Sequence, residues 1–440
     1  MATSSIDWNY FISQHGKRWQ PSAIRGLFPL EKRPGMVSLL AGKPNAATFP
    51  FSSIKVELKP IIPGDPTETL TVESAALEEG LQYGPTAGLG GLVKWLEELQ
   101  EKRHSRKSDG SWRVSVGSGS QDLINKAFHS LVNDDDCILI ESPVYSGSLG
   151  LLNQYQVNLI EVGVDTAGLD PDLLEDILDN WSTKYPGKRF PKILYTIPTG
   201  SNPTGATCPL DRRLRILALV RKHNLLLLED DAYHFLAFNP EHIVPSYFEL
   251  EAREGGGTGR VVRFDSFSKI LSSGMRLGFV SGAKEIIDII DLNTSNTNLQ
   301  PSSTTQAMVL VLLHKWGLDG FLAHTRRVAA FYKDKRDAFE QVAHKYLDGL
   351  ASWVSPEAGM FLYLDLHLTT DGTPGDSSSL ISTTAVEKGV LAVPGIGFLP
   401  NGGISSAVRV SFSLATPEDA ELAFQRLREC VLEARGEAGK

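Results

Sequence analysis

The chain has 440 residues, of which 42% are hydrophobic, and a formal net charge of −9. This length allows two or three domains or one large α/β unit, and the apolar content is that of a globular core. A mildly acidic chain with mixed charges lacks the basic footprint of nucleic-acid-binding proteins, so we expect no nucleic-acid partner.

The three cysteines, Cys137, Cys208 and Cys430, are widely spaced. Because neither a C-x-x-C pair nor an H-E-x-x-H motif occurs, we expect no disulfide framework and no metal site. The N-terminus lacks the basic and apolar regions of a signal peptide, and no apolar run approaches membrane-spanning length. We therefore expect a cytoplasmic protein without a membrane partner.

The first strongly periodic segment covers residues 88–107, where leucines repeat on one face and predict a helix. A short strand at 114–116 leads through a Gly/Ser stretch into a second amphipathic helix. Apolar runs at 137–140, 192–197, 225–228 and 261–264 read as strands, with helical segments such as 209–222 between them. Short apolar strands alternating with helices predict a mostly parallel sheet covered on both faces.

Polar stretches at 103–110, 251–259 and 369–379 predict exposed loops. After Trp316 the pattern changes to long helices, followed by strands at 360–366 and 407–412 and a helix from Pro417. This tail predicts a smaller α+β domain. We expect a large domain over 51–324 and a small domain built from 1–50 and 325–440.

In an open parallel sheet, ligands bind beyond the carboxyl ends of the strands. The strand at 114–116 runs into Gly117-Ser118-Gly119-Ser120-Gln121, which opens a helix and suits a phosphate. The alternative is a Gly/Ser loop with an N-cap serine. Tyr145 follows the strand at 137–140, where its ring could stack on a planar cofactor or pack beneath a proline turn.

Two further strand ends carry polar side chains. Asn202-Pro203-Thr204-Gly205 could present the Asn202 amide to a ligand oxygen, although the same residues also form surface turns. Asp230 closes a four-leucine strand, where a carboxylate is costly to bury without a cationic partner. A protonated pyridine nitrogen would be such a partner. The alternative is an N-cap aspartate.

The stretch from Asp265 to Gly278 follows an apolar strand and contains Ser266, Ser268, Lys269 and Arg276. A lysine amine can form a Schiff base with an aldehyde, while hydroxyls and a guanidinium can hold a phosphate. By itself this pattern also fits a solvated loop. Together the strand ends offer the parts of a pyridoxal phosphate site in a compatible order.

The chain resembles the fold-type I pyridoxal phosphate aminotransferases, and within them the fungal aromatic amino acid and kynurenine/2-aminoadipate aminotransferases. The resemblance rests on residues 40–45, 81–88, 145–147, 202–205, 266–269, 313–317, 358–361 and 408–413. It implies an α/β fold with a seven-stranded, mostly parallel sheet covered by helices, plus a smaller α+β domain. It also implies a homodimer with shared active sites.

The resemblance assigns roles to residues of this chain. Lys269 would bind pyridoxal 5'-phosphate covalently and move the substrate α-proton. The remaining assignments are Asp230 to the pyridine nitrogen, Asn202 and Tyr233 to the phenolic oxygen, Tyr145 to ring stacking, Ser120, Gln121, Ser266, Ser268 and Arg276 to the phosphate, Tyr83 to the neighbouring subunit's phosphate, Arg409 to the substrate carboxylate, Asn202, Gly42, Arg25 and Phe361 to the substrate side, and Leu299 to the substrate pocket of the neighbouring subunit.

The implied activity is ping-pong transamination of tryptophan, phenylalanine or tyrosine, with phenylpyruvate or 2-oxoglutarate as acceptor. Supplying secondary metabolism is compatible with this activity. Lys43 departs from the pattern of relatives, and with Arg25 it could meet a distal carboxylate. A 2-aminoadipate or kynurenine aminotransferase therefore stays an alternative, as does a non-transaminating enzyme on the same fold. A ligand-sensing regulator is disfavoured because no helix-turn-helix pattern precedes Gly42. An inactive scaffold is disfavoured because Lys269, Asp230 and Arg409 are all present.

Overall fold

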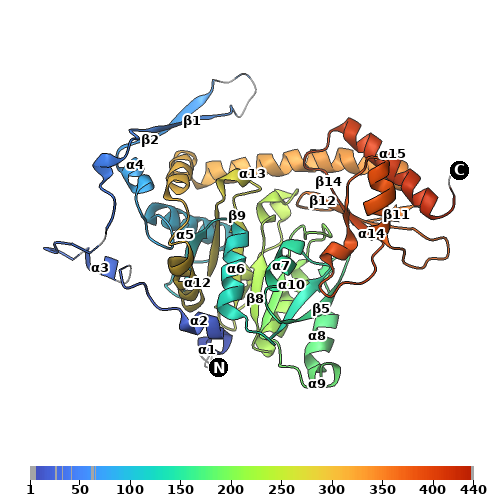
Figure 1. Ribbon diagram of the computed structural model, residues 1–440, viewed down its shortest axis with the longest axis horizontal. Helices are drawn as coiled ribbons and strands as arrows, with labels where there is room; N and C mark the ends of the chain where they lie inside the picture. The colour runs from blue at the N-terminus through green and yellow to red at the C-terminus, as the bar shows by residue number, and fades with distance from the viewer. Residues whose placement is uncertain are drawn as a thin grey trace. The chain divides into compact units, whose positions relative to one another are not determined.

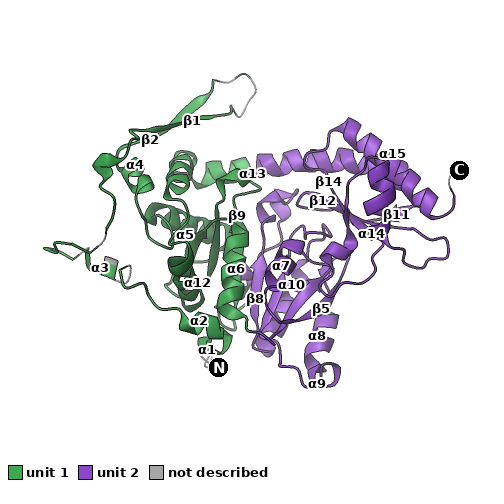
Figure 2. Cartoon of the chain, viewed as in Figure 1, with its two compact units in different colours: residues 1–133, 251–324 green, residues 134–250, 325–440 purple. Residues whose placement is uncertain are grey.

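The computed structural model describes residues 6–24, 27–31, 33–40, 42–60, 64 and 66–437. Contacts divide the chain into two compact units (Figure 2). Unit 1 comprises residues 1–133 and 251–324, and unit 2 comprises 134–250 and 325–440. This is a different division from the predicted large and small domains, which stay a prediction.

Unit 1 begins with short helices and a hairpin and continues with longer helices and three strands. Its elements are α1 (Trp8–Phe11), α2 (Gln14–Arg18), α3 (Phe28–Glu31), η2 (Ala46–Thr48), β1 (Ile54–Leu58), β2 (Glu68–Val72), α4 (Ser74–Leu81), α5 (Gly90–His104), β3 (Trp112–Gly117), α6 (Ser120–Leu131), β9 (Val261–Ser266), η5 (Ser273–Met275), β10 (Gly278–Ala283), α12 (Lys284–Thr297) and the first part of α13 (Ser303–Leu347). Within α13, Gly317 has non-helical backbone angles.

The strands of unit 1 lie in the order β3-β10-β9. β10 is antiparallel to both neighbours, so that Gly278 faces Gly117 on one side and Ser266 on the other. Helix α6 buries Leu123, Ala127 and Phe128, as its apolar periodicity predicts. The predicted helix at 88–107 is confirmed as α5.

A hairpin of β1 and β2 precedes these elements, and Figure 1 shows it standing away from α5 and α12 of the same unit. We did not predict it. The signal was present, because Ile54, Val56 and Leu58 alternate with Lys55 and Glu57, and a period of two is typical of strands.

Unit 2 contains the parallel strands and the C-terminal small sheet. Its elements are β4 (Cys137–Ser142), α7 (Ser146–Leu152), β5 (Asn158–Asp165), β6 (Gly168–Leu169), α8 (Pro171–Asp179), α9 (Trp181–Lys184), β7 (Ile193–Thr196), α10 (Leu210–Lys222), β8 (Leu226–Asp230), η3 (His234–Leu236), η4 (Pro240–His242), α11 (Tyr247–Arg253), the last part of α13, β11 (Ala351–Ser352), β12 (Phe361–Leu366), α14 (Ser377–Leu380), the π-helical turn η6 (Ile381–Ala385), β13 (Val393–Pro394), η7 (Gly395–Phe398), β14 (Ala407–Ser411) and α15 (Pro417–Ala434).

The strands of the larger sheet in unit 2 lie in the order β8-β7-β4-β5-β6. β8, β7, β4 and β5 run parallel, with Ile140 beside Tyr195 and Tyr195 beside Leu228. The side chains of β7 and β8 are buried on both faces, which explains the continuous apolar runs of these two strands in the sequence. Because the strands are parallel and in register, the residues that follow them emerge at the same edge.

The C-terminal part of unit 2 has its own sheet, in the order β11-β12-β14-β13. In Figure 1 this sheet lies beside α14 and α15. A hydrophobic core joins them, in which Leu362 and Leu364 of β12 pack with Phe339 of α13 and Phe424 of α15. This sheet and its core position Arg409 on β14.

The predicted fold class is confirmed: mostly parallel strands with helices, and a smaller α+β part. Apart from the β1–β2 hairpin and the C-terminal sheet, the described residues hold three strands in unit 1 and five in unit 2. The total is one more than the predicted seven. The additional strand is β6, a two-residue antiparallel partner of β5. The predicted loop at 251–259 is wrong at its start, because α11 extends to Arg253.

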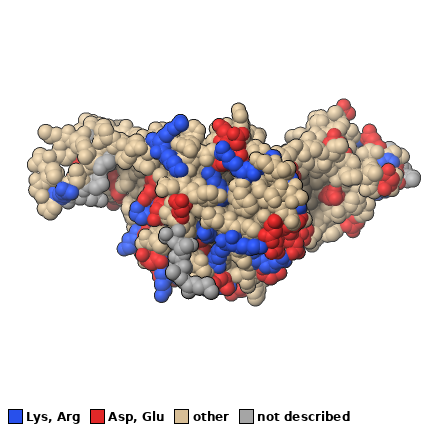
Figure 3. Space-filling model, turned by 90° about the horizontal axis from the view of Figure 1, so that it is seen from below, with Lys and Arg blue, Asp and Glu red and all other residues tan. Residues whose placement is uncertain are grey.

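Acidic and basic side chains lie interspersed on the face that Figure 3 shows. Such pairs include Lys222 with Asp179 at 2.8 Å and Arg215 with Asp172 at 2.5 Å, which join α10 to α8. Exposed pairs of this kind contribute little stability. Within the described residues, none of the helices combines the length and apolarity needed to cross a membrane.

Candidate active site

Asp230 ends β8 and is 6% exposed. One carboxylate oxygen accepts a hydrogen bond from the Tyr195 hydroxyl at 2.6 Å. Burial, and then the charge of Asp230, raises the pKa of Tyr195, so its hydroxyl remains a donor. The sequence predicted Asp230 but not Tyr195. Tyr195 could have been found in the sequence as a tyrosine within an apolar strand, because a buried phenol needs a hydrogen-bond partner.

Asn202 and Arg409 come together although they lie far apart in the sequence. Asn202 is buried, and its side-chain oxygen accepts a hydrogen bond from Arg409 Nη1 at 2.9 Å. The guanidinium carbon lies 4.3 Å from the ring centroid of Phe361 and 5.0 Å from that of Phe398. The structure thus gathers three predicted substrate-side residues and adds Phe398, which we did not predict.

Arg409 is half-buried, and its guanidinium lies beside these aromatic rings. Burial lowers the pKa of Arg409, and nearby Tyr233 and Tyr145 act in the opposite direction. An arginine still remains charged under such conditions and keeps its planar fork of donors. The arrangement therefore offers a fixed, partly desolvated cation that suits a carboxylate.

Tyr233 completes this cluster from the chain segment just after β8. Its ring meets Phe361 edge-on, with centroids 6.3 Å apart. Burial raises the pKa of Tyr233, with a further rise from Asp230, while Arg409 and a hydrogen bond with Asn202 lower it. The hydroxyl therefore stays protonated at neutral pH and is available as a donor.

Tyr145 lies at the start of α7 and folds over Gly147. A Cβ atom on Gly147 would lie 2.3 Å from the tyrosine ring, so only glycine fits there. Tyr145 also influences the pKa of Tyr233, which places its hydroxyl close to this cluster. In unit 2 the structure thus brings together Tyr145, Asn202, Asp230, Tyr233 and Arg409, together with Phe361.

The predicted phosphate residues gather in unit 1 around the N-terminus of α6. Arg276 donates to Ser268 Oγ at 3.3 Å and to the Ser118 carbonyl at 3.3 Å. The Ser268 N–H donates to Ser266 Oγ at 3.2 Å. Gly119 caps α6 without a side-chain hydrogen bond. A guanidinium, hydroxyls and the N–H groups at a helix N-terminus form a donor set that suits a phosphate.

Two glycines allow these groups to approach one another. A Cβ on Gly119 would lie 2.7 Å from Arg276 Nη2, and one on Gly278 would lie 2.7 Å from the Ser120 nitrogen. Gly119 also has a φ of +96°, which side-chain-bearing residues rarely adopt. Ser120 and Gln121 form the first turn of α6, and Lys269 directly follows Ser268, half-buried.

The remaining predicted residues lie on other segments of the chain. Tyr83 and Leu299 are 51% and 41% exposed in the single chain, and Gly42 is also exposed. Arg25 lies outside the described residues. Lys43 forms an ion pair with Glu31 at 3.8 Å.

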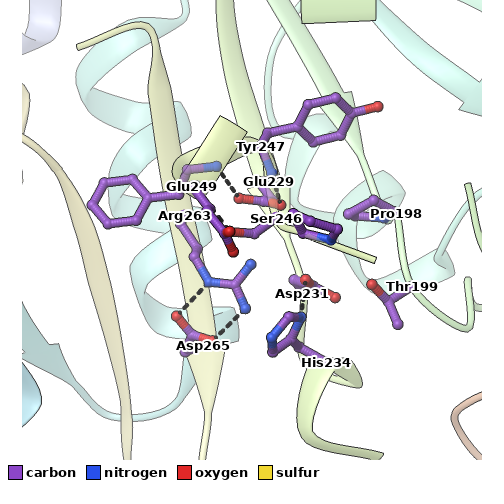
Figure 4. A network of polar contacts seen from close by, with 12 residues as sticks. Pro198, Thr199, Glu229, Asp231, His234, Ser246, Tyr247, Glu249, Arg263 and Asp265 are labelled. Carbon is purple, nitrogen blue, oxygen red and sulfur yellow. Dashed lines mark hydrogen bonds and ion pairs between the residues drawn. The ribbon is translucent and has the colours of Figure 1, made fainter. Parts of the chain in front are cut away.

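Further buried polar side chains form hydrogen bonds near the ends of the strands (Figure 4). Within unit 1, Arg263 donates two hydrogen bonds to Asp265, at 3.0 and 2.8 Å. Within unit 2, Glu229 accepts from the N–H groups of Tyr247 and Phe248 and so fixes the start of α11. In the described residues, no group of three or more His, Cys, Asp or Glu side chains is placed to hold a metal ion.

A donor set for phosphate, a buried carboxylate after a parallel strand and a fixed arginine define a class of protein that binds an anionic cofactor and a carboxylate substrate. The family model for aminotransferase class I and II matches residues 65–427. The chain therefore belongs to the class I and II aminotransferases.

Relatives agree with this assignment. The chain is 42% identical to aminotransferase tdiD of Emericella nidulans, over 96% of this chain and 95% of that protein. It is 37% identical to the mitochondrial kynurenine/alpha-aminoadipate aminotransferase of Mus musculus, over 98% of this chain and 100% of that protein.

Solved structures agree as well. The aromatic aminotransferase Aro9 of Candida albicans matches with a TM-score of 0.86 and 28% identity, covering 97% of each chain. The Pyrococcus horikoshii kynurenine aminotransferase, solved with PMP, KYN and KYA, matches with a TM-score of 0.74 and 26% identity, covering 97% of this chain and 98% of that chain.

Proposed function

We propose that this aminotransferase uses pyridoxal 5'-phosphate to convert an aromatic L-amino acid into its 2-oxo acid, with phenylpyruvate or 2-oxoglutarate as the acceptor. The observation that carries the proposal is the hydrogen bond from Arg409 to Asn202, with the Phe361 and Phe398 rings within 5.0 Å of the guanidinium carbon. A charged fork beside aromatic rings suits a substrate that has a carboxylate and an aryl group.

The residues present fit the cofactor. Ser266, Ser268 and Arg276, with the first turn of α6 at Ser120 and Gln121, would hold its phosphate. The ring would be held by Asp230 at the pyridine nitrogen, by Asn202 and Tyr233 at the phenolic oxygen, and by Tyr145 on one face. When bound, the cofactor supplies an electron sink for the carbanion at the substrate α-carbon.

The chain's own residues then perform the proton transfers and the positioning. The Lys269 amine would bind the cofactor covalently, and as a free amine it would take the α-proton as a general base and return it as a general acid. Asp230 accepts a hydrogen bond from Tyr195 and would stabilise a proton on the pyridine nitrogen. Arg409 would hold the substrate α-carboxylate through its fork of donors.

Lys269→Ala should remove the visible absorbance of lysine-bound pyridoxal phosphate and lower turnover by roughly 10³-fold or more, because it deletes both the covalent anchor and the general base. Lys284→Ala is a matched control, since Lys284 is an exposed lysine of the same unit that pairs with Asp288 at 2.5 Å. Absorbance spectra and steady-state rates decide the matter. Full activity in Lys269→Ala would contradict the assignment.

A 2-aminoadipate or kynurenine donor is the alternative, and the relative from Mus musculus supports it. Such donors require recognition of a distal group, for which Lys43 was a candidate. The ion pair of Lys43 with Glu31 already gives this ammonium a carboxylate partner. We therefore favour the aromatic donor, and a competition between donors separates the two.

A homodimer is also part of the proposal. Tyr83 and Leu299 are exposed in the single chain, where Leu39 and Phe51 of the same unit are 98% and 60% exposed. Exposed apolar side chains support a partner surface where they form one contiguous patch. Sedimentation that gives one chain per particle at all concentrations would refute it.

A cytoplasmic location stays a prediction as well. Its support is that Cys137, Cys208 and Cys430 are all free thiols in buried positions. A relative carries a mitochondrial label, so microscopy of the tagged full-length chain is needed to decide. Fluorescence confined to mitochondria would contradict the prediction.

A further inference from the structure

The loop of residues 197–208 joins β7 to α10 and carries Asn202. Hydrogen bonds within the loop close it on itself. The Ser201 N–H donates to the Ala206 carbonyl at 2.8 Å, and the Cys208 N–H donates to the Pro198 carbonyl at 2.9 Å. These bonds fix the shape of the loop but not its place, so the position of Asn202 depends on contacts from outside the loop.

Glu141 makes the first of these contacts from β4. It is 3% exposed, and one oxygen accepts from the Thr196 hydroxyl at 2.5 Å and from the Ile197 N–H at 3.2 Å. The other oxygen lies 3.5 Å from the Ser201 hydroxyl. In the described part of the chain its partners are neutral donors, at the entry of the loop and beside Asn202.

Arg213 makes the second contact from α10, and its side chain is fully buried. Its Nε donates to the Cys208 carbonyl at 2.8 Å. One Nη2 donates to the Pro198 carbonyl at 2.8 Å and to Thr199 Oγ1 at 3.1 Å, two loop residues that Figure 4 labels. The other terminal nitrogen reaches the Pro245 carbonyl at 3.0 Å.

These four acceptors are all neutral oxygens. No ion pair of Arg213 with a carboxylate occurs among the described residues, and its guanidinium carbon lies 5.7 Å from the ring centroid of Tyr247. Arg213 therefore holds both ends of the loop through carbonyl oxygens. The carboxyl group of Glu141 and the guanidinium of Arg213 are thus both buried. Both form hydrogen bonds with the same loop, and neither is paired with an opposite charge.

Burying a charged group without a counter-ion is costly, and well-packed apolar side chains often give equal or greater stability. A role in stability alone therefore gives no reason for either residue. We propose that Glu141 and Arg213 are positioning residues that fix Asn202, and through it Arg409, for the substrate carboxylate. This inference rests on the proposed function.

The link to the substrate is the 2.9 Å hydrogen bond from Arg409 Nη1 to Asn202 Oδ1. If the loop shifts, this acceptor shifts, and the arginine fork loses its orientation. Carboxylate recognition depends on the direction of the fork as well as on its charge. The effect should therefore appear as weaker binding of carboxylates rather than as a loss of the fold.

The test measures the binding of 3-phenylpropionate, an unreactive aryl carboxylate, to the holoenzyme by calorimetry. Arg213→Met and Arg213→Lys should raise its Kd about tenfold or more, because neither side chain reproduces the fork. Glu141→Gln keeps one acceptor oxygen and should raise Kd less. Arg215→Met is the matched control, because Arg215 lies on the exposed face of α10 and pairs with Asp172. Its Kd should stay within about twofold of the original.

A purely structural role would lower thermal stability without changing Kd. Wild-type Kd in folded Arg213→Met overturns the proposal. If that variant does not fold, wild-type Kd in Arg213→Lys overturns it instead. A double variant sharpens the test: if Arg213 acts through Asn202, Arg213→Lys adds little to the loss caused by Asn202→Ala. Fully additive losses would contradict the proposed route.

Arg409→Met separates this inference from the proposed function. It should abolish measurable binding of 3-phenylpropionate. If Arg409→Met binds the ligand as tightly as the original chain, the proposed substrate site is wrong. If Arg409→Met loses binding while Arg213→Lys and Glu141→Gln retain it, only the positioning inference is wrong.

Discussion

Single side chains carry the chemistry of this chain, and several of them are polar groups buried in an apolar setting. Asp230, Asn202 and Tyr233 are each less than 7% exposed. Each has a hydrogen-bond partner that fixes its direction. Asp230 is paired with Tyr195, Asn202 with Arg409, and Tyr233 with Asn202. Groups fixed before a ligand arrives do not have to be reorganised when it binds.

Glu141 gives a prediction about pH. Burial raises its pKa from 4.5 to about 7; bonds from Thr196, Ile197 and Ser201 oppose the rise, and Asp230 adds to it. Between these pH values the folded chain keeps a proton that the unfolded chain releases, so this residue's contribution to stability falls as pH rises. The loss is on the order of 3 kcal/mol.

Glu141→Gln cannot titrate and should therefore lose this dependence. Urea unfolding of the original chain and of the variant, both without cofactor, at pH 5 and pH 8 measures the difference. We expect the variant to gain in relative stability at pH 8. An equal difference at both pH values would show that Glu141 titrates normally.

At the scale of elements, the ends of strands and the start of α6 place the functional groups. β4, β7 and β8 are parallel and in register, so Tyr145, Asn202 and Asp230 emerge at one edge. In unit 1, β9 delivers Ser266 and leads to Ser268 and Lys269. The antiparallel β10 brings Gly278 against Ser120.

Gly119→Ala tests the start of α6. The added Cβ would lie 2.7 Å from Arg276 Nη2, so Arg276 must move away from Ser118. The alanine would also have to adopt a φ of +96°. We expect at least tenfold weaker cofactor binding and a stability loss of about 1–3 kcal/mol. Fluorescence titration of the cofactor-free chain with pyridoxal phosphate measures the affinity.

Gly90→Ala is the control for this change, because Gly90 starts α5 and a Cβ there would meet nothing within 4 Å. It should bind cofactor as the original chain does. Wild-type affinity in Gly119→Ala would mean that Arg276 does not need its place beside α6.

The sequence predicted the strand ends well because their side chains contrast with the apolar strands before them. Asp230 after four leucines is such a contrast. Glu141 and Arg213 were not predicted. Glu141 binds a segment far away in the sequence, at Thr196, and Arg213 binds backbone carbonyl groups such as that of Pro198. Neither kind of contact leaves a pattern in the sequence. The extent of α11 was missed for the same reason, because its first N–H groups find their acceptor on Glu229.

Across the whole molecule, the family assignment covers most of the chain, from residue 65 to 427. Unit 1 holds the donors suited to a phosphate, and unit 2 holds the buried carboxylate and the arginine fork. A truncated chain without β14 lacks Arg409 and should not bind substrate carboxylates.

The central claim is that the chain transfers an amino group from an aromatic donor. The most direct measurement mixes the cofactor-loaded protein with tryptophan, phenylalanine or tyrosine, without an acceptor, and follows absorbance and product. We predict pyridoxamine phosphate and one equivalent of 2-oxo acid per chain, with slower conversion for kynurenine and 2-aminoadipate. Release of carbon dioxide or ammonia without pyridoxamine phosphate, or faster conversion of the dicarboxylic donor, would contradict the account.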